Sequence, residues 1–492
     1  MSVTLGELLD RGIATSLRGD RAVVVGDVQH DSRRVSAGDL FVAIPGQKVD
    51  GARFVADAIA RGAAAVASED DVQASVPTLR VESARRALAL ASHAAHGDPT
   101  AKLSCIGVTG TNGKTTTTWI LDEALTAIGR KPSLIGTVET RGPGFREPSA
   151  FTTPEADEIA RFADGMVKRG ASHLVMEVSS HALSLHRADG IHFEVAAFTN
   201  LTQDHLDFHG TMEAYFEAKA RLFTELAPRH AVIHVDDPMG AVLAERLDRA
   251  RTRVLTVGRR NERAELRVTD WAMTRAGMRA TLEQAGHDVI ALESALVGAH
   301  NLENLLVAAG ILRAIGASAR EIEAALRGVR GAPGRLERVE DPRDVGVFVD
   351  YAHTPDALAK ALEALRPITP GKLIVVFGCG GDRDRQKRPL MGAAAAARAD
   401  LCVVTSDNPR TEEPRSIVDM ILPGTASAKE ALVEVDRRAA IGLALARASA
   451  GDTVLIAGKG HEDYQILGTT KIHFDDREEA RAAIASITKG GA

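Results

Sequence analysis

The hydrophobic positions of the chain fall into short apolar runs, each followed by a polar loop and a helix-like segment. Between residues 103 and 258 these runs are LSCIGVTG, PSLIGTVET, HLVMEVSSHAL, VAAFTNLTQDH, HAVIHVDD and RVLTVG. Buried strands that alternate with helices are typical of a parallel, doubly wound sheet. The alternation returns between residues 345 and 465 with VGVFVDYAHTPDA, KLIVVFGCGGDRDRQKR, DLCVVTSDNPR and DTVLIAGKGHEDYQ.

Changes in this pattern divide the chain into three predicted domains. Residues 1–98 carry short strand signals, AVVVGDV and DLFVAIPG, and alanine-rich helical stretches, as expected of a small α/β domain. Gly, Pro and Gly cluster in GAPGRLERV (331–339), as they do in linkers. We therefore predict an α/β protein with a small N-terminal domain at 1–98, a central doubly wound P-loop domain at 99–332, and a Rossmann-like C-terminal domain at 333–492.

Composition narrows the class of protein. The 492 residues are 45% hydrophobic and 26% charged, as in ordinary globular proteins. The net charge of -6, without a long basic run, disfavours nucleic acid and anionic membranes as partners. No stretch approaches the roughly 18 apolar residues of a membrane span, and the N-terminus lacks a signal-peptide core, so we expect a cytoplasmic protein. Three cysteines have neither metal-site nor disulfide spacing and are expected in strands: Cys105, Cys379 and Cys402.

The segment GVTGTNGKTTTT (107–118) follows an apolar run and opens a helix-like one. Glycines let backbone N–H groups approach a phosphate, the lysine adds a cation, and the hydroxyl after it suits Mg²⁺. Val108 replaces the first glycine of the strict G-x4-G-K-[ST] pattern, so this is a variant P-loop. A glycine-rich turn without a ligand is the alternative. Nucleotide binding is favoured, by Gly110, Thr111, Asn112, Gly113, Lys114, Thr115 and Thr116.

Polar side chains follow two other predicted strands. Glu177 ends one of them, and a buried carboxylate is costly unless it is paired or bound to metal. A salt-bridged or solvated glutamate is the alternative. His205 follows another strand, where a purely structural histidine is equally compatible. Lys219 lies in a predicted helix, and its surroundings in the sequence indicate only a solvated lysine.

One C-terminal run ends on a charged turn, Asp407-Asn408-Pro409-Arg410. Proline is typical of rigid turns, and a guanidinium can bind a carboxylate through two hydrogen bonds. In open α/β sheets, ligands bind at the carboxyl ends of the strands, where this loop is expected. The turn therefore predicts a ligand contact through Arg410, with a solvated surface turn as the alternative.

Seven segments together resemble motifs of the Mur ligase family, the ATP-dependent amide-forming enzymes of peptidoglycan precursor synthesis. They follow the family order and span nearly the whole chain: GTNGKTTT, EVSSHAL, TNLTQDHLDFHG, YFEAKARLF, GAHNLENLLVA, GAPGRLE and DYAHTPDAL. The resemblance implies ATP on the P-loop and two Mg²⁺ sites held by Thr115, Glu177, His205 and Lys219, the lysine as a carbamate. It also implies ATP contacts at Asn301, Asn304, Arg335 and Asp350, and catalytic roles for Lys114, Lys219, His205, Glu177 and His353.

Within this family, the motifs resemble the branch that adds the third residue of the peptide stem. Three segments resemble the contacts of this branch with a UDP-muramoyl-dipeptide: residues 29–51, FTTPEA and SSHALSLHR. The resemblance implies that this substrate is bound by His30, Ser32, Gln47, Lys48, Val49, Thr152, Thr153, Ser179, Leu185 and Arg187. DNPR resembles the form that uses meso-diaminopimelate. This amino acid has a distal carboxylate, which lysine does not have. The implied contacts with this amino acid are Arg383, Asp407, Asn408, Pro409, Arg410, Gly458 and Glu462.

The implied function is ATP-dependent addition of meso-diaminopimelate to the D-Glu side chain of UDP-MurNAc-L-Ala-D-Glu through an acyl phosphate, by a monomer. The amine must lose a proton, and His353 is a candidate base. Sister ligases, for L-lysine or of the folylpolyglutamate synthase type, are the nearest alternatives. A P-loop ATPase or switch protein is the alternative from another class, and it would hydrolyse ATP without needing an amino acid.

Overall fold

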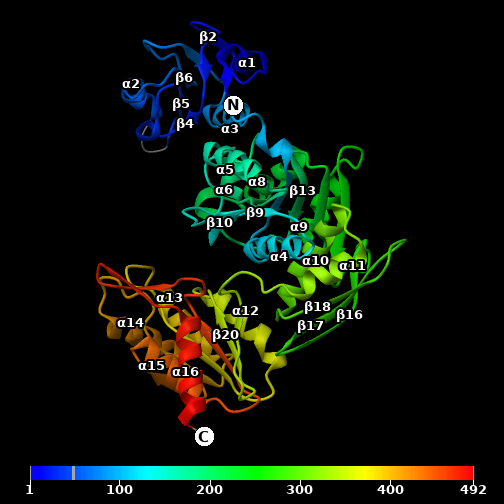
Figure 1. Ribbon diagram of the computed structural model, residues 1–492. Coiled ribbons are helices and arrows are strands. Elements are labelled where there is room, and N and C mark those ends of the chain that lie inside the picture. Colours follow the sequence, from blue (N-terminus) through cyan, green and yellow to red (C-terminus); the bar gives the residue numbers. More distant parts are fainter. Residues whose placement is uncertain (1, 47–49, 491–492) are drawn as a thin grey trace. The chain divides into compact units, whose positions relative to one another are not determined.

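The computed structural model describes residues 2–46 and 50–490 (Figure 1). They belong to two compact units. The first runs from the N-terminus to Val268 and includes Glu283–Ile290 and Leu306–Ala325. The second comprises Thr269–Leu282, Ala291–Leu305 and the chain from Leu326 onwards. Five elements have residues in both units: β16 (Leu266–Thr274), β17 (Gly277–Gln284), β18 (Ile290–Ser294), α10 (Ala299–Ala314) and α11 (Ala319–Arg327).

The N-terminal part is a small α/β fold, as predicted. Its sheet has the order β2-β7-β6-β5-β4, in which only β2 is antiparallel to its neighbour. The strands are β2 (Ser16–Arg18), β4 (Val28–Gln29), β5 (Leu40–Ala43), β6 (Ala65–Ser68) and β7 (Thr78–Arg80), and β1 (Val3–Thr4) pairs separately with β3 (Val24–Val25). The helices are α1 (Leu5–Asp10), α2 (Val55–Ala60) and α3 (Ala84–Ala95).

The central part contains a parallel sheet in the order β9-β12-β8-β13-β14-β15. Its strands are β8 (Ser104–Thr109), β9 (Pro132–Ile135), β12 (His173–Glu177), β13 (Phe193–Phe198), β14 (His230–His234) and β15 (Arg253–Gly258). The intervening helices are α4 (Lys114–Ala127), α5 (Ala156–Lys168), α6 (Ser180–Ser184), α7 (Leu206–His209), α8 (Met212–Thr224) and α9 (Pro238–Arg246), and α11 (Ala319–Arg327) comes later in the chain. The predicted alternation of buried strands and helices is confirmed here.

One edge of this sheet departs from the prediction. The run PSLIGTVET does not form one strand, because β10 (Glu139–Gly142) turns back and pairs antiparallel with β9 and with β11 (Phe145–Pro148). The bend lies against a buried carboxylate: a Cβ atom on Gly136 would lie 2.7 Å from Glu177 Oε1. The next residue, Thr137, uses its backbone N–H to bind the same carboxylate instead of a neighbouring strand.

The C-terminal part is a second doubly wound sheet, in the order β19-β20-β24-β21-β22-β23 with only β19 antiparallel to its neighbour. The strands are β19 (Glu337–Val339), β20 (Gly346–Asp350), β21 (Leu373–Phe377), β22 (Leu401–Val404), β23 (Ala431–Val433) and β24 (Thr453–Ala457), followed by the hairpin β25 (Tyr464–Leu467) and β26 (Thr470–His473). The helices are α12 (Pro355–Leu365), α13 (Lys387–Ala396), α14 (Pro414–Ile421), α15 (Arg437–Arg447) and α16 (Asp476–Gly490). Short 3-10 helices in the chain are Ser32–Arg34, Gly51–Phe54, Pro99–Lys102, Arg366–Ile368 and Leu422–Ser427.

Two separate apolar clusters show that both faces of the C-terminal sheet are covered. Phe348 packs on one face with residues of α12, α13 and α14, while its neighbours Val347 and Val349 pack on the other with α15 and α16. Successive strand residues point to opposite faces, so this split is what strands buried on both sides require. Helix α16 lies next to α15 in Figure 1.

The three cysteines are buried and free. Cys105 and Cys402 lie in β8 and β22 as predicted, whereas Cys379 follows the end of β21, so its predicted place in a strand was wrong. That strand ends at Phe377 because the chain turns over glycines in a loop of the candidate site. Among the described residues, no helix is long and apolar enough to cross a membrane.

Candidate active site

The predicted phosphate loop joins β8 to α4. Gly110 (φ +147°) and Gly113 (φ +87°) adopt backbone conformations that side chains disfavour, which lets the loop close tightly. Helix α4 begins at Lys114, whose Nζ donates 2.9 Å hydrogen bonds to the carbonyls of Gly110 and Thr111. The loop therefore presents a cation and a helix N-terminus together, as a phosphate site requires.

Glu177 ends β12 with no exposed surface and connects the loop to the neighbouring strand. Its Oε2 accepts hydrogen bonds from Thr115 Oγ1 (2.9 Å) and Thr137 Oγ1 (3.1 Å), and its Oε1 accepts one from the Thr137 N–H (2.7 Å). Among the described residues, no lysine or arginine forms an ion pair with it. A buried carboxylate beside hydroxyl oxygens is a donor set that suits Mg²⁺.

Thr137 is a residue that sequence reasoning missed. Besides holding both oxygens of Glu177, its hydroxyl lies 3.0 Å from Thr152 Oγ1. Its only signal in the sequence is a hydroxyl residue after a glycine at the end of an apolar run, which is too common to single out. Its position was decided by the bend between β9 and β10.

Lys219 is buried in α8, with 1% of its surface exposed, so the solvated lysine that the sequence indicated is wrong. Its Nζ donates a 2.8 Å hydrogen bond to Gly110 O, the same carbonyl that Lys114 Nζ binds, and lies 4.4 Å from the centre of the Tyr215 ring. Burial first, and then the charge of Lys114, hold the pKa of Lys219 well below its ordinary value, although Asp204 opposes them. The amine is therefore held near the phosphate loop without a carboxylate partner among the described residues.

His205 is the N-cap residue of α7, exposed and with a left-handed backbone (φ +53°). Its ring centre lies 4.8 Å from that of His181 and 6.0 Å from that of Tyr215, the residue that contacts Lys219. The structure thus places His205 at the same loop edge as the other proposed Mg²⁺ ligands.

The predicted dipeptide contacts gather around the end of β12. Thr153 Oγ1 donates to the Glu177 carbonyl (2.9 Å) and accepts from the Ser179 N–H (3.1 Å). Arg187 donates from Nη1 to the Thr153 carbonyl (2.9 Å) and pairs through Nη2 with Glu155 (2.6 Å). Two further predicted residues lie close by: Thr152 contacts Thr137, and Leu185 is half-buried at the C-terminal cap of α6.

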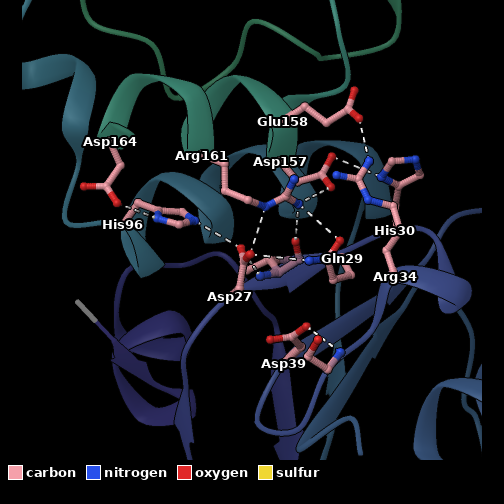
Figure 2. Close-up of polar contacts among 12 residues, drawn as sticks. Asp27, Gln29, His30, Arg34, Asp39, His96, Asp157, Glu158, Arg161 and Asp164 are labelled. Carbon is pink, nitrogen blue, oxygen red and sulfur yellow. Dashed lines mark hydrogen bonds and ion pairs between the residues drawn. The ribbon is translucent and has the colours of Figure 1, made fainter. Parts of the chain in front are cut away.

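Figure 2 shows how the predicted nucleotide segment is anchored to α5. His30 Nδ1 lies 3.0 Å from Asp157 Oδ1, while Arg161 bridges Asp157 (2.7 Å) and Asp27 (2.8 Å). His96 lies between Asp27 (3.1 Å) and Asp164 (3.2 Å). Because α5 starts three residues after Thr153, this network ties the nucleotide segment to the dipeptide contacts.

The charges in this network act on His30. Burial lowers the pKa of the imidazole, but the hydrogen bond and charge of Asp157, with Glu155 and Glu158, outweigh it and raise the pKa above its ordinary value. A protonated His30 would suit an anionic ligand. The predicted contact Ser32 is buried in a 3-10 helix, and the predicted contacts Gln47, Lys48 and Val49 lie outside the described residues.

In the second unit, the turn at Arg410 is braced by the hairpin β25–β26. The backbone N–H of Arg410 donates to Ile466 O (3.0 Å), and its carbonyl accepts from Gly468 N (2.8 Å). Its φ of +52° is uncommon for a side-chain-bearing residue and persists because these contacts hold it. The guanidinium is half-buried and donates from Nη1 to Gly381 O (2.8 Å), so the solvated-turn alternative does not describe it.

The other predicted amino-acid contacts lie at the same edge of the C-terminal sheet, after β21, β22 and β24. Asn408 Nδ2 donates to Glu462 Oε2 (2.9 Å), and a Cβ atom on Gly458 would lie 2.8 Å from Asp407 Oδ2. The exposed Arg383 and the guanidinium of Arg410 both approach Gly380. The structure therefore brings together residues from three loops: Arg383, Asp407, Asn408, Pro409, Arg410, Gly458 and Glu462.

Three more predicted residues, Asp350, Arg335 and His353, belong to the second unit. Asp350 accepts from the N–H groups of Leu336 (2.7 Å) and Ala352 (2.8 Å), and burial raises the pKa of its carboxyl despite the charge of Arg335. The Arg335 guanidinium lies 5.0 Å from the Tyr351 ring centre. His353 is exposed, and its Nδ1 lies 2.9 Å from the Tyr351 carbonyl.

The predicted ATP contacts Asn301 and Asn304 are buried in α10. Asn301 Nδ2 donates to Val297 O (2.8 Å), and Asn304 Nδ2 donates to Asn301 Oδ1 (3.1 Å). Both side chains are thus ordered along their own helix. Their contact with a nucleotide stays a prediction.

Comparisons with known proteins identify the family. Residues 25–96 match the model described as "Mur ligase family, catalytic domain", residues 108–312 match "Mur ligase middle domain", and residues 334–460 match "Mur ligase, glutamate ligase domain". A relative from Gloeobacter violaceus is 50% identical over 498 residues, covering 100% of both chains. The chain belongs to the Mur ligase family. Its relative is named UDP-N-acetylmuramoyl-L-alanyl-D-glutamate--2,6-diaminopimelate ligase.

Solved structures of Mur ligases have the same architecture. One with the same ligase name is 33% identical, covers 99% of this Mur ligase and 100% of its own chain, and superposes with a TM-score of 0.79. The MurF ligase of Thermotoga maritima in complex with ADP is 22% identical, with coverage of 95% and 98% and a TM-score of 0.61, which shows a common fold. The three-part α/β organisation expected from the sequence is confirmed, while its exact boundaries stay predictions.

Proposed function

We propose that this Mur ligase uses ATP to join meso-diaminopimelate to the D-Glu side-chain carboxylate of UDP-MurNAc-L-Ala-D-Glu. The observation that carries the proposal is the braced, half-buried Arg410, whose Nη1 contacts the carbonyl of Asn408 (3.4 Å), the residue that lies next to Asp407 and donates to Glu462. Diaminopimelate ends in an ammonium and a carboxylate, so its receptor needs both acidic groups and a guanidinium. The name of the 50% identical relative supports the same amino acid.

The first step is phosphoryl transfer to the acceptor carboxylate. An oxygen of the D-Glu side chain attacks the γ-phosphorus of ATP, the bond to the β-phosphate oxygen breaks, and an acyl phosphate and ADP result. Lys114 and the N–H groups of the phosphate loop hold the β- and γ-phosphates. The hydrogen-bonded series Thr115–Glu177–Thr137–Thr152 connects this loop to a proposed dipeptide contact, Thr152. This arrangement favours transfer between two substrates over simple ATP hydrolysis.

Mg²⁺ fits the residues present, since Thr115 and Glu177 converge through oxygen atoms and His205 lies at the same edge. When bound there, it would supply positive charge that stabilises the transferring phosphoryl group. Lys219 completes the proposed set of ligands as a carbamate: its neutral amine adds CO₂, releases a proton, and becomes an anion. Its burial and lowered pKa support this reaction, because only the neutral amine is nucleophilic.

The second step forms the amide. The amine nitrogen of diaminopimelate attacks the acyl carbonyl carbon, the carbon–oxygen bond to phosphate breaks, and the nitrogen loses a proton. His353 Nε2 is the proposed acceptor of that proton, because Nδ1 is occupied by the Tyr351 carbonyl. Arg410 and Arg383 would bind the distal carboxylate, and Asp407 and Glu462 the distal ammonium.

The proposal is tested by measuring phosphate release from ATP with UDP-MurNAc-L-Ala-D-Glu and Mg²⁺, offering meso-diaminopimelate or L-lysine in parallel. Phosphate release with diaminopimelate alone, together with an amide product of the expected mass, is the predicted result. Release with lysine instead would keep the ligase and remove the role of Arg410. Release without any amino acid would indicate a P-loop ATPase, and release with a folate and glutamate only would indicate the folylpolyglutamate synthase type.

A further inference from the structure

A fully buried lysine lies behind the amino-acid loops and has no part in the steps above. Lys459 follows β24 between Gly458 and Gly460, and none of its surface is exposed. Its Nζ lies 3.3 Å from Asn408 Oδ1, 3.6 Å from Glu462 Oε2 and 3.9 Å from Asp407 Oδ1. One ammonium thus faces all three polar side chains proposed to bind the ammonium end of diaminopimelate or to support that contact.

The nearest carboxylates to the ammonium of Lys459 are those of Asp407 and Glu462. A nearby buried cation, Arg437, is already matched by Asp476, with Nη2 and Oδ2 2.6 Å apart. Burial first, with the charge of Arg437, holds the pKa of Lys459 below its ordinary value, while Asp407 and Glu462 oppose this shift and favour the charged form. The buried carboxylate of Asp407 and the half-buried carboxylate of Glu462 would repel each other, and an ammonium close to both offsets that repulsion.

Lys459 also fixes the orientation of Asn408. The Oδ1 atom of Asn408 receives two donors, the Ile466 N–H (3.0 Å) and Lys459 Nζ (3.3 Å). Because both donors require the oxygen, the amide nitrogen must point the other way, where it donates to Glu462 Oε2 (2.9 Å). That bond engages one oxygen of Glu462 and leaves Oε1 for another partner.

We propose that Lys459 is a positioning residue for the amino-acid substrate: it holds Asp407, Asn408 and Glu462 in the arrangement that receives the distal ammonium. The inference rests on the proposed function and adds a residue outside the proposed contacts. Lys459 does not touch the substrate, since its three neighbours and the Tyr464 ring, 5.4 Å from Nζ, surround it. Its loss should therefore weaken amino-acid binding and leave the ATP reaction chemistry unchanged.

The test compares Lys459→Met with wild type for the KM of each substrate and for kcat. We expect the KM for diaminopimelate to rise about tenfold to a hundredfold, the range for losing a hydrogen bond to a charged group, with kcat and the KM for ATP within about twofold. Lys471→Met is the matched control: its Nζ also lies over the Tyr464 ring, at 3.6 Å, but on the exposed strand β26. It should behave as wild type.

Lys459→Gln covers the case in which the methionine variant folds poorly, seen as a lowered melting temperature and an altered KM for ATP. Glutamine keeps a donor for Asn408 without the charge, so the KM for diaminopimelate should rise less than with methionine. An unchanged KM for diaminopimelate in a folded variant, with wild type active, would overturn the inference and leave the proposed function standing. A wild-type enzyme that never uses diaminopimelate would overturn both.

Discussion

Two buried lysines, one in each compact unit, have opposite surroundings. Lys219 faces a backbone carbonyl and a second lysine, whereas Lys459 faces Asp407 and Glu462. Burial is the largest cause of a lowered pKa in both. The second-largest influence on the pKa of Lys219 is the charge of Lys114, which lowers it further. The second-largest influence on the pKa of Lys459 is the charge of Asp407, which raises it.

The difference indicates different chemistry for the same side chain. An unmatched buried amine is stable only when neutral, and a neutral amine can react. A buried ammonium between carboxylates is stable as an ion and can order its neighbours. The phosphate region thus leaves a position for new negative charge, while the amino-acid region offsets part of its negative charge with its own lysine before a ligand arrives.

The largest effect is expected from Lys219→Ala, which removes the proposed carbamate. We expect kcat for phosphate release to fall about 10²- to 10³-fold, as when a charge-stabilising group is lost from an active site. A ¹³C NMR spectrum in ¹³C-bicarbonate should show a carbamate signal in wild type and not in the variant. A variant with unchanged kcat would remove the contrast between the two lysines.

Arg410→Ala should reduce kcat/KM for diaminopimelate about 100-fold, because the distal carboxylate loses a partner that can form two hydrogen bonds. The KM for ATP should stay within about twofold. Arg410→Lys is the matched control, since alanine and lysine have the same Cβ cost at φ +52°. Lysine keeps the charge but not the planar guanidinium, so we expect an intermediate loss of kcat/KM. Equal kcat/KM in wild type and both variants would show that the turn does not bind the substrate.

A smaller effect in the phosphate region is expected from Thr137→Val, which deprives Glu177 of a hydroxyl donor. The Mg²⁺ concentration that gives half the maximal rate should rise about tenfold, the lower end for losing a group that orients a metal ligand. Thr140→Val is the control, because Thr140 is buried and its hydroxyl contacts Ser149 instead of Glu177. If both variants require the same Mg²⁺ concentration, Thr137 does not orient a metal ligand.

The smallest effect concerns the contact of the half-buried His30 with the buried Asp157. Because the folded-state pKa of His30 is raised, its protonated form stabilises the fold fully below the unfolded-state pKa of about 6.5, and this contribution is lost as pH rises through the folded-state pKa. Compared with His30→Gln, wild type should gain on the order of 1 kcal/mol of stability at low pH and none at high pH. Thermal melting from pH 5.5 to 8.5 measures the difference; a constant difference would show that His30 does not titrate.

Local patterns were sufficient for much of this protein. Alternating apolar runs predicted both parallel sheets, and the glycines with Lys114 and Thr115 predicted a strand, a tight loop and a helix in the right order. These features depend on neighbours in the chain: hydrophobic periodicity, backbone freedom and helix termini. The charged turn ending in Arg410 was also visible, because proline and arginine stand side by side in the sequence.

The surroundings of the two lysines were decided only by the tertiary structure. Lys219 lies 109 residues from the carbonyl it binds, and Lys459 lies 51 residues from Asn408. No periodicity shows whether such a lysine is buried, or whether its neighbour is a carbonyl, an amine or a carboxylate. Burial makes a charged lysine unfavourable. The neighbouring group then decides whether the lysine loses its proton or pairs with a carboxylate. The chemistry of each lysine could therefore be inferred only from the folded structure.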